Sequence, residues 1–321
     1  MRLRMRAAER TPALSTMPNG RAFVDAKRGG FGWPERHIQY WLILPAVIAM
    51  GGVLVYPLLF SLWVSLFDWP LTSQGTRWVG VDNYRNAVTS PFFHQVLVQS
   101  VGFMVICLLL TFVFGMALAL LLNLDFPGRG LLRTLFLLPM LIAPTLTGFN
   151  FRWIFNDRFG LANQLLLYFH LGQPKAWLAD PTLARVAIII TSVWSGTPFF
   201  MLLLLAGLQS LPDSPMEAAI IDGANAWQRF WDITLPLLRP VIVVAAAIQI
   251  IDLFRVFDTV YVMTSGGPAH STELFPYYAF RSAFSEDRAG YASALGYVTL
   301  LVTVIFLIPI LRSDRSGNET A

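Results

Sequence analysis

Charged side chains interrupt an apolar stretch of about 25 residues, and they are the first residues of the sequence that could do chemistry. The stretch runs from about Arg239 to Met263 and carries Asp252, Arg255 and Asp258. An ionised side chain is costly in hydrocarbon, so these residues should face protein or a water-filled cavity. Two interpretations stay open. Asp252 and Arg255 could pair on one helix face and hold helices together, or the acids could serve a polar ligand or a coupling ion.

Two stripes of small and polar residues could line a pathway for a polar ligand, which needs hydrogen-bonding groups deep in hydrocarbon. Spacings of three and four residues put each stripe on one helix face. Pro198 is expected to disturb the backbone of the first stripe. Ordinary packing of small residues between helices is the alternative for both stripes. The first stripe is Ser192, Ser195, Gly196 and Phe199, and the second is Gln249, Asp252, Leu253 and Val256.

Catalytic constellations are missing from the sequence. Its four histidines are scattered, and it has no H-E-x-x-H, G-x-S-x-G or G-x-x-x-x-G-K-[ST] motif. An intramembrane enzyme built on Asp252 and Asp258 is disfavoured because residues six apart face differently on a helix. The single cysteine, Cys107, excludes an intrachain disulfide or a Cys-based zinc site. We therefore expect no enzyme activity, metal or cofactor in this chain.

The elements that must position these residues are membrane-spanning helices. Only 13% of the 321 residues are charged, 55% are hydrophobic, and the mean hydropathy is +0.58, which predicts an integral membrane protein. Long windows poor in charge predict an all-α fold with six transmembrane helices. The expected spans are 38–67, 96–124, 134–154, 186–210, 239–263 and 289–311, between an N-terminal tail over 1–37 and a C-terminal tail over 313–321.

The distribution of basic residues predicts the orientation of the chain. Eight of the 23 Lys and Arg residues precede the first apolar run, and 14 fall on the side of the termini when six spans are assumed. The positive-inside rule then puts both termini in the cytoplasm. Topology and contact with anionic lipid explain the net charge of +4, so no nucleic-acid partner is expected.

A charged and aromatic segment over residues 212–236 separates the fourth and fifth expected spans on the cytoplasmic side. Ser214 followed by Pro215 and Glu217 predicts a capped helix start, and the helix should end near Gly223. Further along, Trp227, Phe230 and Trp231 should form an exposed aromatic face. Such a face has no role in spanning a membrane and suits docking into the groove of a partner protein.

The same segment resembles the cytoplasmic loop of the membrane subunits of binding-protein-dependent ABC importers. That loop reads E-A-A, three residues, G, nine residues, I-x-L-P, and every fixed position matches at the right spacing. Asp222 also fits the family, as does Pro240 after the loop. The matching residues are Glu217, Ala218, Ala219, Gly223, Ile233, Leu235 and Pro236.

Two further stretches narrow the resemblance to carbohydrate-type permeases of the maltose-permease kind. One is Trp194 to Pro198, and the other runs from Phe257 to Thr264 and into Gly266-Gly267-Pro268. The resemblance covers roughly residues 38 to 312. It implies a multi-pass protein of the bacterial cytoplasmic membrane that forms half of a translocation pathway for a sugar, polyol or related carbohydrate. The aromatic rings of Phe254, Phe257 and Tyr261 would then pack against a sugar ring.

The resemblance also implies partners. A second permease subunit would complete the pathway, two ATPase subunits would hydrolyse ATP with Mg²⁺, and an extracytoplasmic binding protein would deliver substrate. The loop would act as a coupling helix in a cleft of the ATPase, with Glu217 as a polar contact and Gly223 as the turn; alternatively, Glu217 only caps its own helix. A stand-alone secondary transporter or channel coupled to an ion is the alternative function. The substrate and the partner permease stay undetermined.

Overall fold

The computed structural model describes residues 38–72 and 75–315. The expected basic tail over 1–37 lies outside the described residues, as does most of the expected tail over 313–321. The chain divides into two units, Met1–Pro57 and Leu58–Ala321. Helix α1 (Ile38–Met50) continues through the π-helical turn η1 (Gly51–Val55) into α2 (Tyr56–Val64), and the division between the units falls within α2. The helical stretch Tyr40–Val64 is long and apolar enough to cross a membrane.

Three long helices form the frame of the second unit: α4 (Pro91–Asn123), α8 (Pro181–Gln209) and α15 (Ala289–Arg315). Each of the first two starts with a capping side chain followed by proline at the first helical position, where a missing N–H costs nothing. Ser90 Oγ accepts from Phe93 N at 3.4 Å, and Asp180 Oδ1 accepts from the backbone N of residues 182 and 183 at 2.9 Å. All three helices are long and apolar enough to span a membrane.

Two other segments are bent, and this corrects the continuous spans expected from the sequence. The expected span 134–154 is split into α5 (Arg129–Leu141) and α6 (Pro144–Ile154), which meet at 99°. The expected span 239–263 is also interrupted, because α12 (Arg239–Leu253) ends ten residues early and α13 (Asp258–Met263) follows. At its other end α12 is bent by 66° from the helical stretch Ala226–Leu237. The described residues thus hold four spanning helices, or six if each bent pair makes one span.

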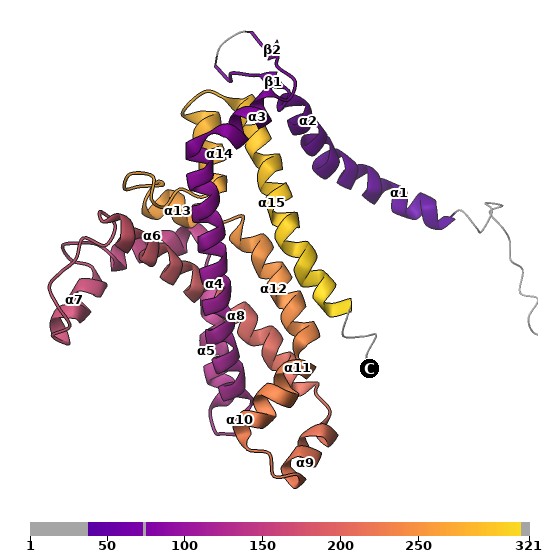
Figure 1. The fold of residues 1–321 in the computed structure, drawn as a ribbon, viewed down its shortest axis with the longest axis vertical. Coiled ribbons are helices and arrows are strands. Elements are labelled where there is room, and N and C mark those ends of the chain that lie inside the picture. The colour runs from indigo at the N-terminus through magenta and orange to yellow at the C-terminus, as the bar shows by residue number, and fades with distance from the viewer. Residues whose placement is uncertain (1–37, 73–74, 316–321) are drawn as a thin grey trace, which may run out of the picture. The chain divides into compact units, whose positions relative to one another are not determined.

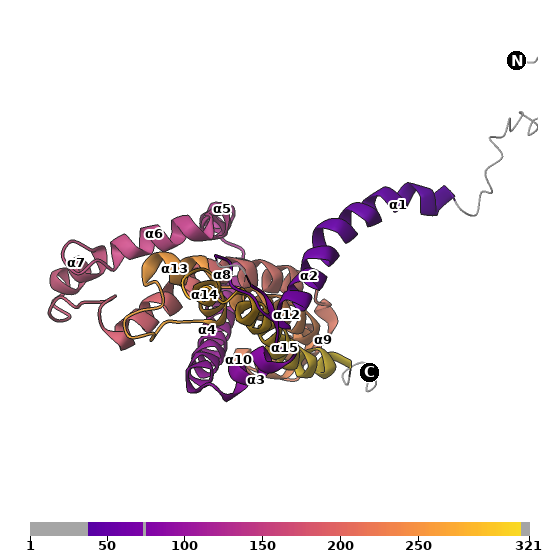
Figure 2. The same cartoon turned by 90° about the horizontal axis from the view of Figure 1, so that it is seen from above.

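Close packing of α4 against α8 forms the centre of the unit, and both views show these helices side by side (Figures 1 and 2). A Cβ added at Gly115 of α4 would lie 2.6 Å from Cβ of Phe200, so glycine is what lets the two backbones approach. Phe200, Met201 and Leu204 are fully buried in this layer. Because lipid tails are as apolar as the side chains, the hydrophobic effect adds little to helix association in a membrane. Dispersion contacts at this small-residue interface hold the two helices together instead.

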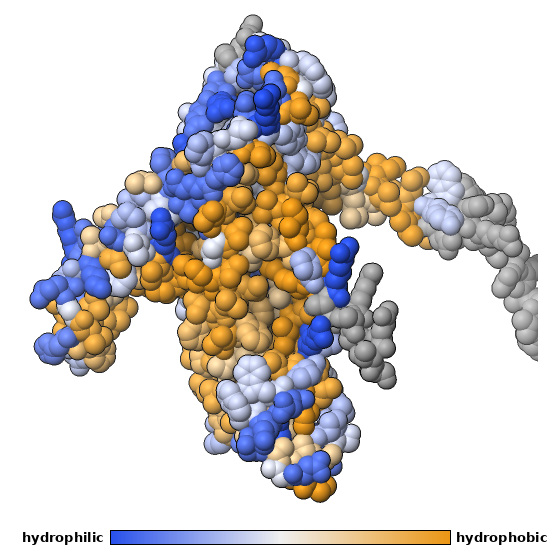
Figure 3. Space-filling model, viewed as in Figure 1, coloured by the Kyte–Doolittle hydropathy of each residue, from blue (hydrophilic) through white to orange (hydrophobic). Residues whose placement is uncertain are grey.

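Short elements cover the two ends of this helical unit. At one end lie the two-stranded antiparallel ladder of β1 (Phe67–Asp68) and β2 (Arg77–Trp78), with Phe67 opposite Trp78, and helices α3 (Asp82–Thr89) and α14 (Phe275–Phe284). At the other end lie α9 (Asp213–Ile221), α10 (Ala226–Arg229), the π-helical turn η2 (Phe230–Thr234) and α11 (Leu235–Leu237). The helix α7 (Leu161–Tyr168) follows α6. Figure 3 shows hydrophilic residues gathered at these ends and apolar residues over the long helices between them.

Candidate functional site

A single pocket of about 390 Å³ brings together the two stripes expected from the sequence. The first stripe lies on α8 and the second on the last turn of α12 and the segment after it. Every one of the eight residues lines this pocket: Ser192, Ser195, Gly196, Phe199, Gln249, Asp252, Leu253 and Val256. Helix periodicity places the residues of each stripe on one helix face. In the tertiary structure both faces turn toward the same cavity.

The wall on α8 offers hydrogen-bonding capacity that the described residues leave unused. Ser192 is 9% exposed, and its buried Oγ has no hydrogen-bond partner there. Across the pocket Gln249 is 5% exposed, and its amide nitrogen would lie 2.7 Å from a Cβ at position 196. An unpaired buried polar group costs about 1–3 kcal/mol, which a ligand hydroxyl in the pocket would recover. The wall therefore suits a hydroxyl-rich ligand.

Irregular backbone borders the pocket at both breaks in the helices. Ile142 lies between α5 and α6, and residues 255–257 lie between α12 and α13; all four line the cavity. Non-helical backbone at membrane depth is tolerated only where it is buried in protein or lines a water-filled cavity. Pro198 behaves differently, because α8 runs through it as one helix, so the expected disturbance of that backbone does not interrupt the helix.

Several pocket residues were missed in the sequence, namely Met140, Ile142, Pro144 and Thr259. The first three come from the bent segment α5–α6, whose Pro139 and Pro144 were the available signal for a break. Thr145 beside them donates through Oγ1 to Asp258 Oδ1 at 2.6 Å. The α5–α6 segment therefore supplies a third wall.

The charged residues of the pocket do not form the ion pair considered from the sequence. Asp252 lies near the C-terminus of α12, and Arg255 lies beyond that end of the helix. Both residues are exposed and both line the cavity. Among the described residues no ion pair joins them, and the bond between the two residues is the backbone one from Arg255 N to Asp252 O at 3.1 Å. Asp258 is half-buried and bound by Thr145. A carboxylate and a guanidinium are thus free to meet a ligand.

The segment 212–236 forms α9, a left-handed turn and α10, as the sequence indicated, with one correction. Ser214 is not the N-cap: α9 begins at Asp213, Pro212 occupies the cap position, and no side chain caps the helix. The helix ends at Ile221, and Gly223 follows with φ +80°, a conformation that glycine adopts without strain. Glu217 is exposed and forms no cap. Of the α9 residues only Ala219 is buried.

The second half of the segment is anchored to the helical core at one side and open at the other. Asn225 and Gln228 form a capping box, with bonds of 2.9 and 2.8 Å between their side chains and backbone nitrogens. Phe230 and Leu235 pack against the core around Leu238. Trp227 and Trp231 stay 70% and 47% exposed, with their ring centroids 5.5 Å apart. Ile233 is half-buried, and Pro236 is exposed, as are Ala218 on α9 and Asp222 at the C-cap of α9.

Comparison with known proteins identifies the family. Residues 111–313 match the family described as the binding-protein-dependent transport system inner membrane component. The chain belongs to this family. The match includes the α9–α10 segment and both helices that carry the pocket stripes.

Related permease proteins are similar over nearly the full chain. A trehalose/maltose transport system permease protein of Thermococcus litoralis is 35% identical over 285 residues, which cover 89% of this chain and 96% of the relative. A sulfoquinovosyl glycerol transport system permease protein of Agrobacterium fabrum is 35% identical, over 87% and 92% of the two chains. A trehalose transport system permease protein of Mycobacterium tuberculosis is 32% identical, over 91% and 94%.

A solved structure shows the same fold. A chain of a bacterial ABC transporter involved in the import of the acidic polysaccharide alginate aligns with a TM-score of 0.75 and 22% identity, covering 88% of this chain and 96% of that one. The chain is thus an inner-membrane, multi-pass permease of the ABC transporter type. Membership of this family decides against the stand-alone ion-coupled transporter.

Proposed function

We propose that this chain is one of two permease subunits of an ATP-dependent, binding-protein-dependent importer of a carbohydrate. The observation that carries the proposal is the convergence of both stripes on one pocket, bordered by two breaks in helices of the membrane part. Uncoiled backbone and unpaired side-chain groups there can replace the water that a polyhydroxy solute loses in the bilayer. The pocket holds the groups such a solute needs.

Carbohydrate is the substrate class that fits the lining. Ser192 and Gln249 can exchange hydrogen bonds with hydroxyl groups, and the ring of Phe257 lies at the same pocket for the apolar face of a sugar. Phe257 is stacked on Tyr261 at 5.3 Å, which fixes the ring, whereas Phe254 is buried against Phe306. The relatives named above transport trehalose, maltose or sulfoquinovosyl glycerol, and the similar structure belongs to an importer of alginate. We infer that a sugar, polyol or related carbohydrate passes at this pocket.

Residues 212–236 are proposed to couple this permease to an ATPase. The residues assigned to coupling are Glu217, Ala218, Ala219, Asp222, Gly223, Ile233, Leu235 and Pro236. Support comes from an exposed Glu217 that caps nothing, and from Ile221 and Trp227, which are 85% and 70% exposed at one end of the unit. Large exposed apolar side chains beside a charged residue are typical of protein contacts. ATP and Mg²⁺ would be used by two ATPase subunits, so this chain needs no cofactor of its own.

The proposed topology follows the sequence. Six spans form a permease domain over 38–312, with each bent pair counted as one span, and both tails face the cytoplasm together with the coupling segment. The extracytoplasmic binding protein then approaches the opposite end, which carries the β1–β2 ladder, α3 and α14. One chain of a solved alginate ABC transporter has the same fold as this chain, and that transporter is in complex with an alginate pentasaccharide-bound periplasmic protein, which supports such a partner here.

The test is purification of the tagged chain from its native membrane in mild detergent, followed by identification of the proteins that come with it. We expect a second permease, an ATPase and transport that requires ATP. Glu217→Ala should lower ATPase retention or substrate-stimulated ATP hydrolysis at least about tenfold, as expected when a charged contact of about 1.5–3 kcal/mol is lost.

Asp213→Ala is the matched control, since Asp213 is an exposed acid in the first turn of the same helix. Its effect should be small. A chain that purifies alone and transports without ATP would contradict the proposal, and equal effects of both substitutions would contradict the coupling role of Glu217.

A further inference from the structure

A second groove of about 610 Å³ lies between α4, α8 and the segment that precedes α14, and it shares no lining residue with the substrate pocket. One wall follows α4, where His94, Val98, Gly102 and Ile106 succeed each other at four-residue intervals. Val98 is 72% exposed and Ile106 is 45% exposed, so the groove opens on the surface of the described unit. Nothing in the proposed transport cycle uses it.

Polarity changes along the groove from one end to the other. His94, Gln95 and Gln99 line it in the first turns of α4, whereas Gly102, Phe103 and Ile106 line it further along the helix. At 1.5 Å per residue, His94 and Ile106 are about 18 Å apart along the axis. The hydrocarbon of one leaflet is about 15 Å deep. An amphiphile with one polar end and one extended acyl chain has this length and this distribution of polarity.

The polar end has unmet hydrogen-bonding groups and an available positive charge. Ser271 is 4% exposed, and its Oγ is buried without a partner among the described residues, as is Oε1 of Gln99. Arg185 donates from Nε to Ser271 O at 2.9 Å and forms no ion pair within the described part of the chain. It lies four residues after Pro181, which begins α8, and thus about 6 Å from the start of that helix.

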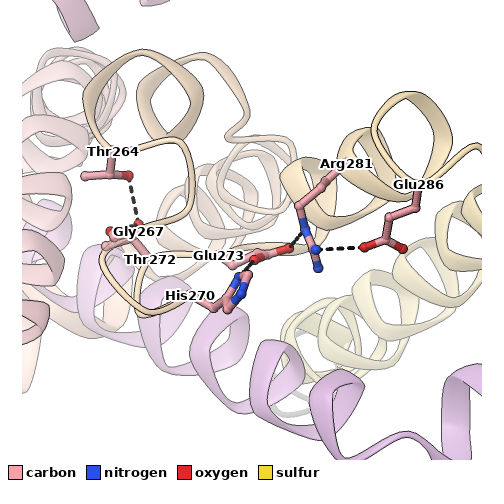
Figure 4. A network of polar contacts seen from close by, with 7 residues as sticks. All are labelled: Thr264, Gly267, His270, Thr272, Glu273, Arg281 and Glu286. Atoms are coloured by element: carbon pink, nitrogen blue, oxygen red, sulfur yellow. Dashed lines mark hydrogen bonds and ion pairs between the residues drawn. The ribbon is translucent and has the colours of Figure 1, made fainter.

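A buried polar network holds the segment that presents Ser271 (Figure 4). Glu273 is fully buried, accepts from Arg281 Nε at 2.8 Å and lies 2.6 Å from His270 Nδ1. Thr272 donates to Gly267 O at 2.8 Å and contacts Thr264 Oγ1 at the same distance. The polar end of the groove is therefore shaped before any ligand arrives, which reduces the ordering cost of binding.

We propose that this groove binds a membrane phospholipid, with its phosphate at Arg185 and one acyl chain along α4. The guanidinium fork recognises phosphate oxygens, and the unpaired hydroxyl of Ser271 beside it supplies a further donor. The hydrocarbon chain fills the apolar part, where Gly102 leaves room: a Cβ at this position would meet no atom within 4 Å. The occupant is the lipid of the leaflet in which the start of α8 lies.

The test measures phospholipid bound to the purified importer complex by native mass spectrometry, after delipidation and addition of phosphatidylglycerol in detergent. We expect a retained lipid on the wild type and at least a fivefold loss of occupancy in Gly102→Leu, whose side chain would fill the groove. Arg185→Gln should lower occupancy similarly and Arg185→Lys should restore part of it. Diacylglycerol, which has no phosphate, should be retained poorly by the wild type.

Gly130→Leu is the matched control, because Gly130 is an exposed helical glycine of α5 with no atom within 4 Å of an added Cβ. This variant should keep the lipid, and size-exclusion profiles report assembly of every variant. Equal lipid occupancy in the wild type and Gly102→Leu overturns the proposal. A photo-crosslinker placed at Val98 should capture phospholipid in native membranes, and capture of the second permease in its place also overturns the proposal.

Discussion

Gly196 on α8 and Gln249 on α12 lie in such close contact that a Cβ at position 196 would stand 2.7 Å from the Gln249 amide nitrogen. This contact joins the two pocket-lining helices at the level of the cavity. Glycine at position 196 lets the Gln249 amide approach α8, because the side chain of any other residue would occupy the space that the amide fills. The position of one hydrogen-bonding group in the pocket thus depends on the absence of a side chain on the facing helix.

Gly196→Ala should change substrate handling more than stability. The added methyl group meets the far end of a flexible side chain, so the Gln249 amide can turn away into the pocket at little cost, and alanine gains about 1 kcal/mol of helix propensity. We expect normal assembly and a KM for transport raised about threefold to tenfold, measured in proteoliposomes of the complete importer. Gly130→Ala on exposed α5 is the control, and an unchanged KM in Gly196→Ala would refute a role for Gln249 in substrate contact.

Asp252→Asn should lower substrate-stimulated transport while leaving subunit assembly intact. Asp252 is exposed in the pocket and has no ion pair among the described residues, so the amide removes a charged acceptor without breaking an internal contact. A lost charged hydrogen bond of about 1.5–3 kcal/mol corresponds to a roughly tenfold or larger loss of transport. Assembly is followed by co-purification of the partner subunits, and loss of assembly would assign Asp252 a structural role instead.

Glu273→Gln should destabilise the protein far more than Glu286→Gln, although both acids contact Arg281. Glu273 is fully buried between Arg281 and His270, whereas the Glu286 side chain is 31% exposed. Removing one partner of a buried pair costs about 3–5 kcal/mol, and a partly exposed pair contributes about 1 kcal/mol or less. A loss of about 3 kcal/mol lowers the melting temperature by about 4–5 °C for a chain of this size. Thermal unfolding in detergent compares the variants, and equal shifts would contradict this assignment.

The attachment of residues 71 and 72 to Asp287 should weaken in acid. The Asp287 carboxyl accepts bonds from the Thr72 hydroxyl and from the backbone N of Leu71 and Thr72, and the Thr72 side chain is the main cause of its lowered pKa. A lowered folded-state pKa means that the carboxylate stabilises this contact above the usual value of about 3.9, and that the contribution is lost as the pH falls through the folded pKa.

Hydrogen-exchange protection factors of Leu71 and Thr72, corrected for intrinsic rates, should therefore be higher at pH 7 than at pH 3. Asp287→Asn should remove most of this difference. Asp82→Asn is the control, since the Asp82 side chain accepts no hydrogen bond from the described residues. A pH dependence that persists in Asp287→Asn would assign the effect to another group.

The local features could be predicted from the sequence, because they depend on periodicity and on turn chemistry. Spacings of three and four residues fixed which side of α8 carries Ser192 and Gly196, and Gly223 fixed the end of α9 within two residues. The prediction that Ser214 is the N-cap of α9 was wrong. A helix start at Asp213, with Pro212 at the cap position, competes equally well with a start after Ser214.

The pairing of helix faces and the break after α12 depend on the tertiary structure. Pro139 and Pro144 mark the break between α5 and α6, but Pro198 leaves α8 intact and α12 ends at Leu253 without a proline, so proline alone does not predict the breaks. A helix can end inside a membrane only where neighbouring groups satisfy the freed backbone. Arg152 of α6 does this by donating to Val262 O of α13 at 3.0 Å, across 110 residues of sequence. Such a bond depends on packing between distant segments, and no local pattern contains it.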